Sequence, residues 1–567
     1  MAELTLGTIG LAGQIFVSVV HTYRFVATAR GLAVDAPVVF WKLRIEQLRF
    51  LEWGRFWGAN TGVFDAHLEN EGIADAACGI LKEMERLMND VKSLTEKYGM
   101  ERVGEEMVGT GFDRRKNGPS VMKQFKYALK DKQKLESLIN DLTAFNDGLY
   151  NLLRMSERRS VVVQAQSAVL RDVETVQEIE ALQDASSWDT TAKPSSIYNG
   201  LYQSAAYKLA TRKQQEEDAM PAGTLVAPTQ HDLWKRPMTS LTSFIRQSPA
   251  IRVLAEYTGD ESRPNCTVLV EWKPFDPNSP NARSIRARVD SLVGLLGSPK
   301  KPAEVRIPNC LGFVEDEARS RFGYLFELPE GSNVIEPVTL HMSLSRGQHG
   351  ILPTLGERFE LARNLTSAVV RLHDCGWVHG SLSSGNIVFF PSADNSRVIS
   401  VASPYILGFN YTRPTDIAEP TLEWTSNAIP SPENLQSLYR HPLLTVSNPS
   451  HPNFQDSVSM STKETLRLSR RQRYDMFSVG LLLLEIGLWE SLDTIWKPKY
   501  SNTPTGFVEK LQRVYLPRLG HRMGATYMWV TALLLGDWEG ERGITTTLDD
   551  VDTNWAYVVS ELMKCQA

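Results

Sequence analysis

The sequence predicts a multidomain protein, with an all-α helical bundle first and an α+β domain after it. The chain has 567 residues, which is too long for a single hydrophobic core. Apolar positions recur at a helical period near the N-terminus, whereas β-rich runs precede long helical ones in the second half, which is an α+β order. We expect a helical bundle over residues 1–160, a helical brace and linker over 161–240, and the second domain over 241–567.

Composition excludes several classes of protein. Hydrophobic residues make up 42% and charged residues 22% of the chain, as in an ordinary folded protein. The net charge of −5 argues against a nucleic-acid binder that relies on overall basic charge. The five cysteines form no C-x-x-C pair, so neither a zinc site nor a disulfide framework is expected. The start Met-Ala-Glu lacks a basic signal region, and we expect a cytoplasmic protein.

The bundle is predicted from apolar stripes at helical spacing. Gly, Pro and Asn in YGM at 98–100 and in DRRKNGPS at 113–120 predict turns between antiparallel helices. A further helix is expected over 161–182, and another over 196–218 after a linker at 186–196. The stripes are Trp41, Ile45 and Leu48; Met84, Leu87, Met88 and Val91; and Leu135, Leu138, Ile139, Leu142, Phe145 and Leu149.

The second domain begins with β-rich runs at 266–275 and 321–329, with a helix expected between them at 284–296. After Pro353 the pattern is helical, first in LGERFELARNLTSAVVRLHDCG, which ends in a glycine stop, and later in RYDMFSVGLLLLEIGLW. The polar segment at 447–469 is rich in Ser, Asn and Pro and is expected to be a surface insertion.

The stretch HDCGWVHGSLSSGNIVFF at 373–390 resembles the catalytic loop of protein kinases. The pattern H-R-D-L-x-x-x-N of that family aligns without gaps on residues 379–386. This resemblance implies a bilobal, protein-kinase-like fold over about residues 245–567. Three more motifs follow the order of the family: Val270-Glu271-Trp272-Lys273 for V-A-I-K, Asp475 to Gly480 for D-x-W-S-x-G, and Pro432-Glu433 or Arg440-His441-Pro442 for A-P-E.

The same motifs differ from those of an active kinase at the positions of the catalytic and metal-binding residues. Ser381 stands where the family has its catalytic aspartate, and a serine is not a base at neutral pH. Ser383 replaces the lysine that steadies the phosphoryl group. Gly408 replaces the magnesium-binding aspartate and brings no oxygen ligand. Lys273 and Asn386 are the nucleotide-binding candidates that remain.

These departures predict a pseudokinase with no catalytic residue and no metal site, in which ATP binding, if any, is weak and insensitive to magnesium. No glutamate lies between Lys273 and Glu304 to pair with the lysine, unless Asp290 substitutes, and no G-x-G-x-x-G precedes it. His379 is interpreted as structural, with its imidazole bracing nearby backbone. The alternative for the remaining pair is that Lys273 is a solvated strand residue and that Asn386 only satisfies its own loop.

Three segments of the N-terminal bundle carry a family resemblance: LTLGTIGLAGQIFVSVV, FWKLRIEQLRFLEWGRFWG and DKQKLESLINDLTAFNDGLYNLL. They resemble the HeLo domain, a prion-inhibition and propagation domain of fungal incompatibility and cell-death proteins. In that family the bundle damages membranes when its first helix enters lipid, under the control of a C-terminal part. A bundle, a brace and a dead kinase in this order are also similar in plan to the mixed-lineage kinase domain-like proteins of necroptosis, which is an analogy between architectures.

The first helix has two readings. Leu4 to Val20 spans 17 residues, just short of the roughly 20 that cross a hydrocarbon core, and glycines at three-residue spacing suit close packing either in a bundle or in a membrane. It is either a permanent core helix or, as the resemblance implies, a conditional membrane segment. Gln14 is expected to face away from the core and Leu11 towards it. The inserting residues would be Leu4, Leu6, Ile9, Leu11, Ile15 and Phe16.

A basic cluster follows within the bundle and is either a solvated face or a site for anionic head groups, at about 1 kcal/mol per basic residue near the membrane surface. It consists of Arg114, Arg115, Lys116, Lys123, Lys126, Lys130, Lys132 and Lys134.

The leading hypothesis is a cytoplasmic regulator or executor of fungal-type programmed cell death and heterokaryon incompatibility, associated with the plasma membrane on activation. Its expected partners are a protein partner or upstream sensor, further copies of itself and anionic membrane lipids, and no nucleic acid. The alternatives are an active or residually active Ser/Thr-type kinase in signalling and a protein-binding scaffold. Magnesium-dependent phosphate transfer would identify the kinase, and liposome leakage by residues 1–160 would separate the leading hypothesis from the scaffold.

Overall fold

The computed structural model of the chain describes residues 11–20, 23, 36–58, 73–89, 100–113, 118–129, 132–187, 197–219, 234–241, 251–259, 264–278, 282–345, 352–394, 399–414, 435–441, 460–502, 504–536 and 551–566. Internal contacts divide the chain into two compact units, unit 1 (Met1–Ala206) and unit 2 (Tyr207–Ala567). The division falls within helix α10 (Ile197–Ala219). The boundaries at residues 160 and 240 stay predictions.

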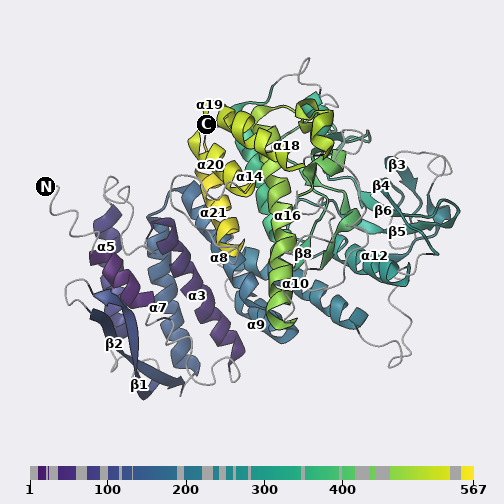
Figure 1. Cartoon of the computed structure of the whole chain (residues 1–567). Coiled ribbons are helices and arrows are strands. Elements are labelled where there is room, and N and C mark those ends of the chain that lie inside the picture. Colours follow the sequence, from purple (N-terminus) through teal and green to yellow (C-terminus); the bar gives the residue numbers. More distant parts are fainter. Residues whose placement is uncertain are drawn as a thin grey trace. The chain divides into compact units, whose positions relative to one another are not determined.

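Unit 1 consists mainly of helices (Figure 1). Besides residues 11–20 and the start of α10, they are α3 (Pro37–Phe56), α5 (Ile73–Asn89), α7 (Lys132–Asn151), α8 (Met155–Asp172) and α9 (Val176–Ser186). Helix α3 packs against α7, α8 and α9. The predicted apolar stripes are confirmed as core: their described members are buried, except for Leu87 and Phe145, which are half-buried.

Residues 100–129 form a β-hairpin where the sequence analysis expected helices, so the prediction of an all-α bundle is wrong in this segment. Strands β1 (Met100–Asp113) and β2 (Gly118–Leu129) pair antiparallel. Three glycines within β1 disfavour a helix. In β2, Phe125, Tyr127 and Leu129 follow the two-residue period of a strand. The predicted turn at 113–120 therefore lies between two strands.

The helix expected over 161–182 is also corrected, because it is interrupted between α8 and α9. The Thr175 hydroxyl accepts a hydrogen bond from the N–H of Glu178 at 3.3 Å, and the Glu178 carboxylate accepts one from the N–H of Thr175 at 3.0 Å. This capping box satisfies amides that a new helix would otherwise leave unpaired. The chain can therefore stop one helix and start another here. The helix expected over 196–218 is confirmed as α10.

Unit 2 begins with a four-stranded antiparallel sheet (Figure 1). Its strands, β3 (Arg252–Tyr257), β4 (Cys266–Pro274), β5 (Cys310–Asp316) and β6 (Arg321–Glu327), lie in the order β3-β4-β6-β5. Helix α12 (Ala282–Leu296) comes between β4 and β5 in the chain and contacts β5. Both predicted β-rich runs and the helix between them are confirmed.

The rest of unit 2 is largely helical, with α16 (Met460–Leu488) packed against four other helices. Its second half is largely apolar and is buried from Asp475 to Leu488, as expected for a helix surrounded by others. The predicted glycine stop after α14 is Gly376, with φ +81°. The other helices are α13 (Leu340–Ser345), α14 (Leu355–Asp374), α17 (Leu492–Ile495), α18 (Pro504–Lys510), α19 (Leu516–Met523), α20 (Ala525–Leu534) and α21 (Val551–Lys564).

Short strands connect the helical part. They are β7 (Val338–Thr339), β8 (Trp377–Val378), β9 (Ile387–Phe389), β10 (Tyr405–Ile406) and β11 (Arg413–Pro414); β9 pairs with both β10 and β7, and β11 pairs with β8. The predicted insertion at 447–469 is corrected in its second part, because residues 460–469 are the first turns of α16. Residues 447–459 lie outside the described part.

Candidate functional site

Residues 379–386, called here the degenerate loop because they depart from the kinase pattern that they resemble, connect β8 to β9 and are anchored on the buried helix α16. Asp475 of α16 accepts hydrogen bonds from the N–H of His379 at 2.7 Å and of Gly380 at 2.8 Å, and it also contacts the His373 ring at 2.9 Å. Burial raises the pKa of Asp475, but the bonds from His373 and the backbone amides outweigh it and hold the pKa below its usual range. The carboxylate therefore stays charged and fixes the backbone of the loop.

His379 is fully buried and bonded to backbone on both sides. Nε2 donates to the carbonyl oxygen of Leu407 at 3.2 Å, and Nδ1 accepts from the N–H of Ser381 at 3.3 Å. Burial lowers the pKa of His379, although Asp475 and Glu271 act in the opposite direction. A neutral imidazole with one donor and one acceptor fits both contacts. This geometry is that of a structural residue.

Ser381 is 8% exposed, and its hydroxyl is bonded within the protein. It donates a short hydrogen bond to the carbonyl oxygen of Gly408. A hydroxyl without a base beside it accepts no proton at neutral pH, and the nearest ring nitrogen, Nδ1 of His379, lies 3.5 Å away and is already an acceptor. Ser383 is 1% exposed. The Ser381 hydroxyl thus holds the loop to Gly408, and the carbonyl oxygen of Ser383 accepts from the N–H of Asn386 at 2.9 Å.

Gly408 has no room for a side chain. Its φ is +90°, a conformation that strongly favours glycine. A Cβ atom there would lie 2.2 Å from Cγ of Asn386, well inside van der Waals contact. The space that an aspartate side chain would need is therefore filled by Asn386. Glycine at position 408 and the position of the Asn386 side chain therefore depend on each other.

Both nucleotide-binding candidates make internal contacts. Lys273 of β4 is 6% exposed and donates to the carbonyl oxygen of Asn410 at 2.6 Å, so it is not a solvated strand residue. Asn386 donates to the carbonyl oxygen of Ser381 at 2.7 Å. Asp290, the suggested substitute partner, is buried on α12.

Two further residues lie at the same place: Arg252, which belongs to no motif in the sequence, and Glu271, which the sequence shows only as a member of the motif at 270–273. Arg252 of β3 reaches the side-chain oxygen of Asn386 at 2.6 Å and the carboxylate of Glu271 at 2.7 Å. Glu271 of β4 is fully buried, and it also accepts from the N–H of Gly408 at 3.0 Å. The signal that would have found them is an arginine and a glutamate directly opposite each other in a β-hairpin, and it depends on the register of that hairpin.

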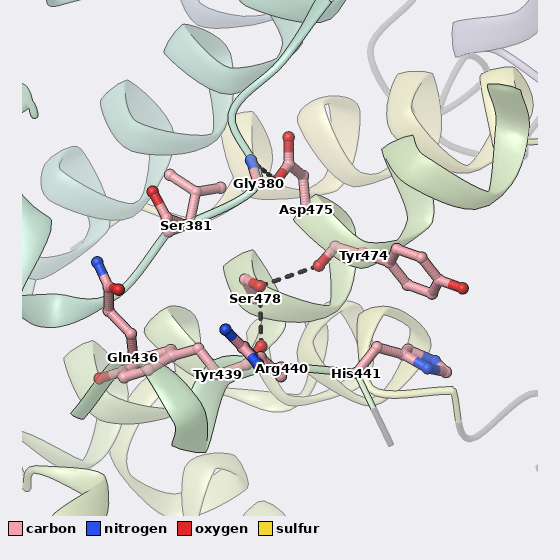
Figure 2. Close-up of a pocket in the computed structure, with 10 residues that line it drawn as sticks. Gly380, Ser381, Gln436, Tyr439, Arg440, His441, Tyr474, Asp475 and Ser478 are labelled. Atoms are coloured by element: carbon pink, nitrogen blue, oxygen red, sulfur yellow. Dashed lines mark hydrogen bonds between the residues drawn. The ribbon is translucent and has the colours of Figure 1, made fainter. Parts of the chain in front are cut away.

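A small pocket opens beside the loop (Figure 2). Neither Lys273 nor Asn386 lines it. The hydroxyl of Ser478, one of the lining residues, lies within hydrogen-bond distance of two carbonyl oxygens, that of Tyr439 at 3.0 Å and that of Tyr474 at 2.9 Å. Burial, and to a smaller extent the positive charge of Arg473, lowers the pKa of His441 to about 4. The lining comes from Gly380, Ser381 and Leu382 of the loop, Gln436, Tyr439, Arg440 and His441, and Tyr474, Asp475 and Ser478 of α16.

A second buried carboxylate, Glu485, lies further along α16. It accepts from the Tyr439 hydroxyl at 2.5 Å and from the N–H of Leu492 at 2.8 Å, and the Ser384 hydroxyl lies 3.5 Å away. These bonds lower its pKa, yet burial is the larger effect and raises the pKa to about 8. The group therefore changes charge near neutral pH.

In unit 1, residues 11–20 form a helix that is buried on one face. Ile15 is 5% and Phe16 is 3% exposed. The Phe16 ring stacks on Phe50 of α3 at 4.6 Å between ring centres, and a Cβ atom on Gly54 would come within 1.9 Å of it. The absence of a side chain at Gly54 lets the two helices approach closely.

The outer face of this helix carries Leu11, Gln14 and Val17, all exposed. Gln14 faces away from the core, as expected. The expectation that Leu11 points into the core is wrong, because its side chain is 42% exposed. Leu4, Leu6 and Ile9 lie outside the described residues. Within the part of the chain that is described, no helix is both long and apolar enough to span a bilayer.

The described members of the basic cluster lie on two elements. Lys123 and Lys126 belong to β2, and Lys132 and Lys134 to the start of α7. Its remaining members, Arg114, Arg115, Lys116 and Lys130, fall outside the described residues. Among the residues that the structure describes, no group of three or more His, Cys, Asp or Glu side chains is arranged to hold a metal ion.

Unit 1 also contains a buried polar cluster that the sequence analysis did not predict. Glu46 of α3 is fully buried and pairs with Arg49 at 2.9 Å. Its carboxylate also accepts from the side-chain amide of Asn146 at 2.7 Å and from the hydroxyl of Tyr198, which lies at the start of α10. In a buried network of this kind, a polar atom that lacks a hydrogen-bond partner costs stability.

Comparison with known families identifies the N-terminal part of the chain. The family model HeLo, described as prion-inhibition and propagation, matches residues 4–184. No curated protein matches the chain. The match covers the helical segments α3 to α9 together with the β1–β2 hairpin. Residues 4–184 of this chain are a HeLo domain.

Proposed function

We propose that this protein is a regulator or executor of fungal-type programmed cell death, related to heterokaryon incompatibility, in which the HeLo domain is the effector and unit 2 controls it. The observation that carries the proposal is the HeLo match over residues 4–184. An upstream sensor or protein partner acts on unit 2, and copies of the active chain associate at anionic membranes. The protein is cytoplasmic until it is activated.

Unit 2 serves in this proposal as a kinase-like domain. Three features support that assignment: the four-stranded antiparallel sheet, a helix inserted between β4 and β5, and a loop between β8 and β9 that is fixed to a buried helix by Asp475. The motifs at Lys273, at residues 379–386 and at Asp475 fall on a strand of the sheet, on this loop and on this helix, in that order. A shared architecture alone assigns no activity.

Unit 2 acts without catalysis. The Ser381 hydroxyl is bonded to a carbonyl oxygen, so it offers no base. Asn386 fills the space next to Gly408, so no carboxylate fits where a metal would be held. A residual kinase activity would need both groups, which is why we place this alternative second.

Membrane action would use the first helix. Its apolar face packs on α3 through Phe16, so it has to leave the bundle before it can enter lipid. Its outer face is less polar than an ordinary surface, because Leu11 and Val17 are 42% and 37% exposed. A protein-binding scaffold would instead keep this helix permanently in the core.

Gln14 separates these two roles, because it is exposed on the inserting helix. We expect Gln14→Lys to keep the melting temperature of the full chain and to abolish leakage of anionic liposomes, since a lysine near the bilayer centre costs roughly 2.5–3.5 kcal/mol. The matched control is Met155→Lys at an 81% exposed position on α8, which should leak like the wild type. Viability of fungal cells that express the full chain or residues 1–206 is measured in parallel. If expression does not harm the cells, or if folded Gln14→Lys causes as much leakage as the wild type, the protein-binding scaffold is the function that remains.

A further inference from the structure

The guanidinium of Arg252 lies among three oxygen atoms that come from different parts of unit 2. Nε donates to the carboxylate of Glu271 at 2.7 Å, Nη1 to the carbonyl oxygen of Gly385 at 2.7 Å, and Nη2 to the side-chain oxygen of Asn386 at 2.6 Å. The Arg252 side chain is 16% exposed and the Glu271 side chain is not exposed at all. One carboxylate, one backbone carbonyl and one amide oxygen are the ligand types that hard divalent cations use.

The pairing of β3 with β4 places the Arg252 guanidinium beside these oxygen atoms. Arg252 of β3 and Glu271 of β4 are directly opposite each other in the antiparallel pair. The same carboxylate accepts from the N–H groups of Gly408 at 3.0 Å and Phe409 at 3.2 Å. One arginine and one glutamate thus join the sheet to the loop at 385–386 and to the turn at 408–409.

The charge of Arg252 is necessary for this arrangement. Without it, the fully buried Glu271 carboxylate would keep only backbone amides as partners, and an uncompensated buried charge is strongly destabilising. The planar guanidinium also directs three N–H groups at three separate acceptors, which the point charge of a lysine does less well.

We infer that Arg252 is a built-in cation that takes the place of a divalent metal ion at the junction of the sheet and the degenerate loop. The kinase resemblance implies a magnesium–nucleotide site at Asn386, but the residues do not fit one, because the amide oxygen of Asn386 already accepts from Arg252. The site is closed to an anionic metal–phosphate group and needs no metal to hold its shape. This role of Arg252 is independent of the proposed cell-death function.

The test is thermal unfolding of the full chain, first in chelator and then with Mn²⁺ at about 5 mM, where a ligand that binds only the folded state raises the melting temperature. Wild type should show no Mn²⁺ response. Arg252→Ala should melt several degrees lower and regain part of the loss in Mn²⁺, which can enter the vacated oxygen site. Arg252→Ala combined with Glu271→Gln removes the charged ligand and should show no Mn²⁺ response.

Two outcomes would overturn the inference: a melting temperature of Arg252→Ala equal to that of the wild type, or a lowered one that Mn²⁺ does not raise. If Arg252→Ala does not fold, Arg252→Lys and Arg252→Gln decide the question, because the first keeps the charge and the second keeps most of the volume. A smaller loss of melting temperature for Lys than for Gln supports the built-in cation. Equal losses, or a smaller loss for Gln, contradict it.

Discussion

Glu485 gives the stability of unit 2 a pH dependence that one substitution should remove. Burial raises its pKa from 4.5 to about 8. Between these values the folded protein holds a proton that the unfolded chain releases, so the free energy of unfolding falls as the pH rises. The stability that this proton contributes is fully present below about pH 4.5 and is lost as the pH rises to about 8. At 1.36 kcal/mol per pKa unit, the whole change is at most about 5 kcal/mol.

Glu485→Gln should flatten this slope, because the amide has nearly the same shape and does not ionise. Its oxygen can still accept from Leu492, and its NH₂ group can donate to the Tyr439 oxygen, whose own proton can then go to Ser384, 2.7 Å away. Above about pH 8 the variant should be more stable than the wild type. Urea unfolding followed by circular dichroism at several pH values measures both effects.

The matched control is Glu360→Gln, at an exposed position on α14, which should keep the wild-type slope. Equal slopes for Glu485→Gln and the wild type between about pH 5 and 8 would refute the reasoning, since they would mean that Glu485 is charged in the folded protein throughout this range.

Two further predictions follow from the packing around the degenerate loop and the first helix. Gly408→Asp, alone or with Ser381→Asp, should lower the free energy of unfolding by about 1–3 kcal/mol, because the position has a positive φ and the new side chain would collide with Asn386. Magnesium-dependent phosphate transfer should stay at background in both variants. Restored transfer would favour the kinase alternative. Ile15→Glu should destabilise unit 1 by several kcal/mol because the side chain is buried, whereas Leu11→Glu should change the melting temperature little. Similar losses for both would contradict the observed orientation of the helix.

Elements with a strong periodic pattern could be predicted from the sequence. The stripes on α3 and α7 and the strands β4 and β6 with helix α12 between them depend on local alternation, and the structure has them, whereas strand β5 between α12 and β6 was not predicted. The break at Thr175 was missed although its capping box, Thr175 and Glu178, is visible in the sequence. The β1–β2 hairpin was missed because the apolar residues of the segment are diluted by charges and glycine.

The site was predictable only where it depends on residue type. The serine at position 381, where the kinase pattern that it resembles has an aspartate, offers no base by its residue type alone. The bond from Asn386 to Ser381 lies within the loop, as the alternative for Asn386 expected. The contacts of Lys273 with Asn410 and of Asn386 with Arg252 could not be predicted, because these residues are more than a hundred positions apart in the chain. Arg252 has no motif of its own, and its role follows from the register that places it opposite Glu271.

The position of Tyr198 affects how a fragment of this protein should be cut. The HeLo match ends at residue 184, but the compact unit continues to Ala206. A fragment ending at 184 would lack the hydroxyl that bonds Glu46 and the Leu201 side chain, which is fully buried in the intact chain. Its toxicity or instability would then reflect a damaged protein and not the activity of the domain. The family match therefore ends about twenty residues before the end of the compact unit that contains these contacts.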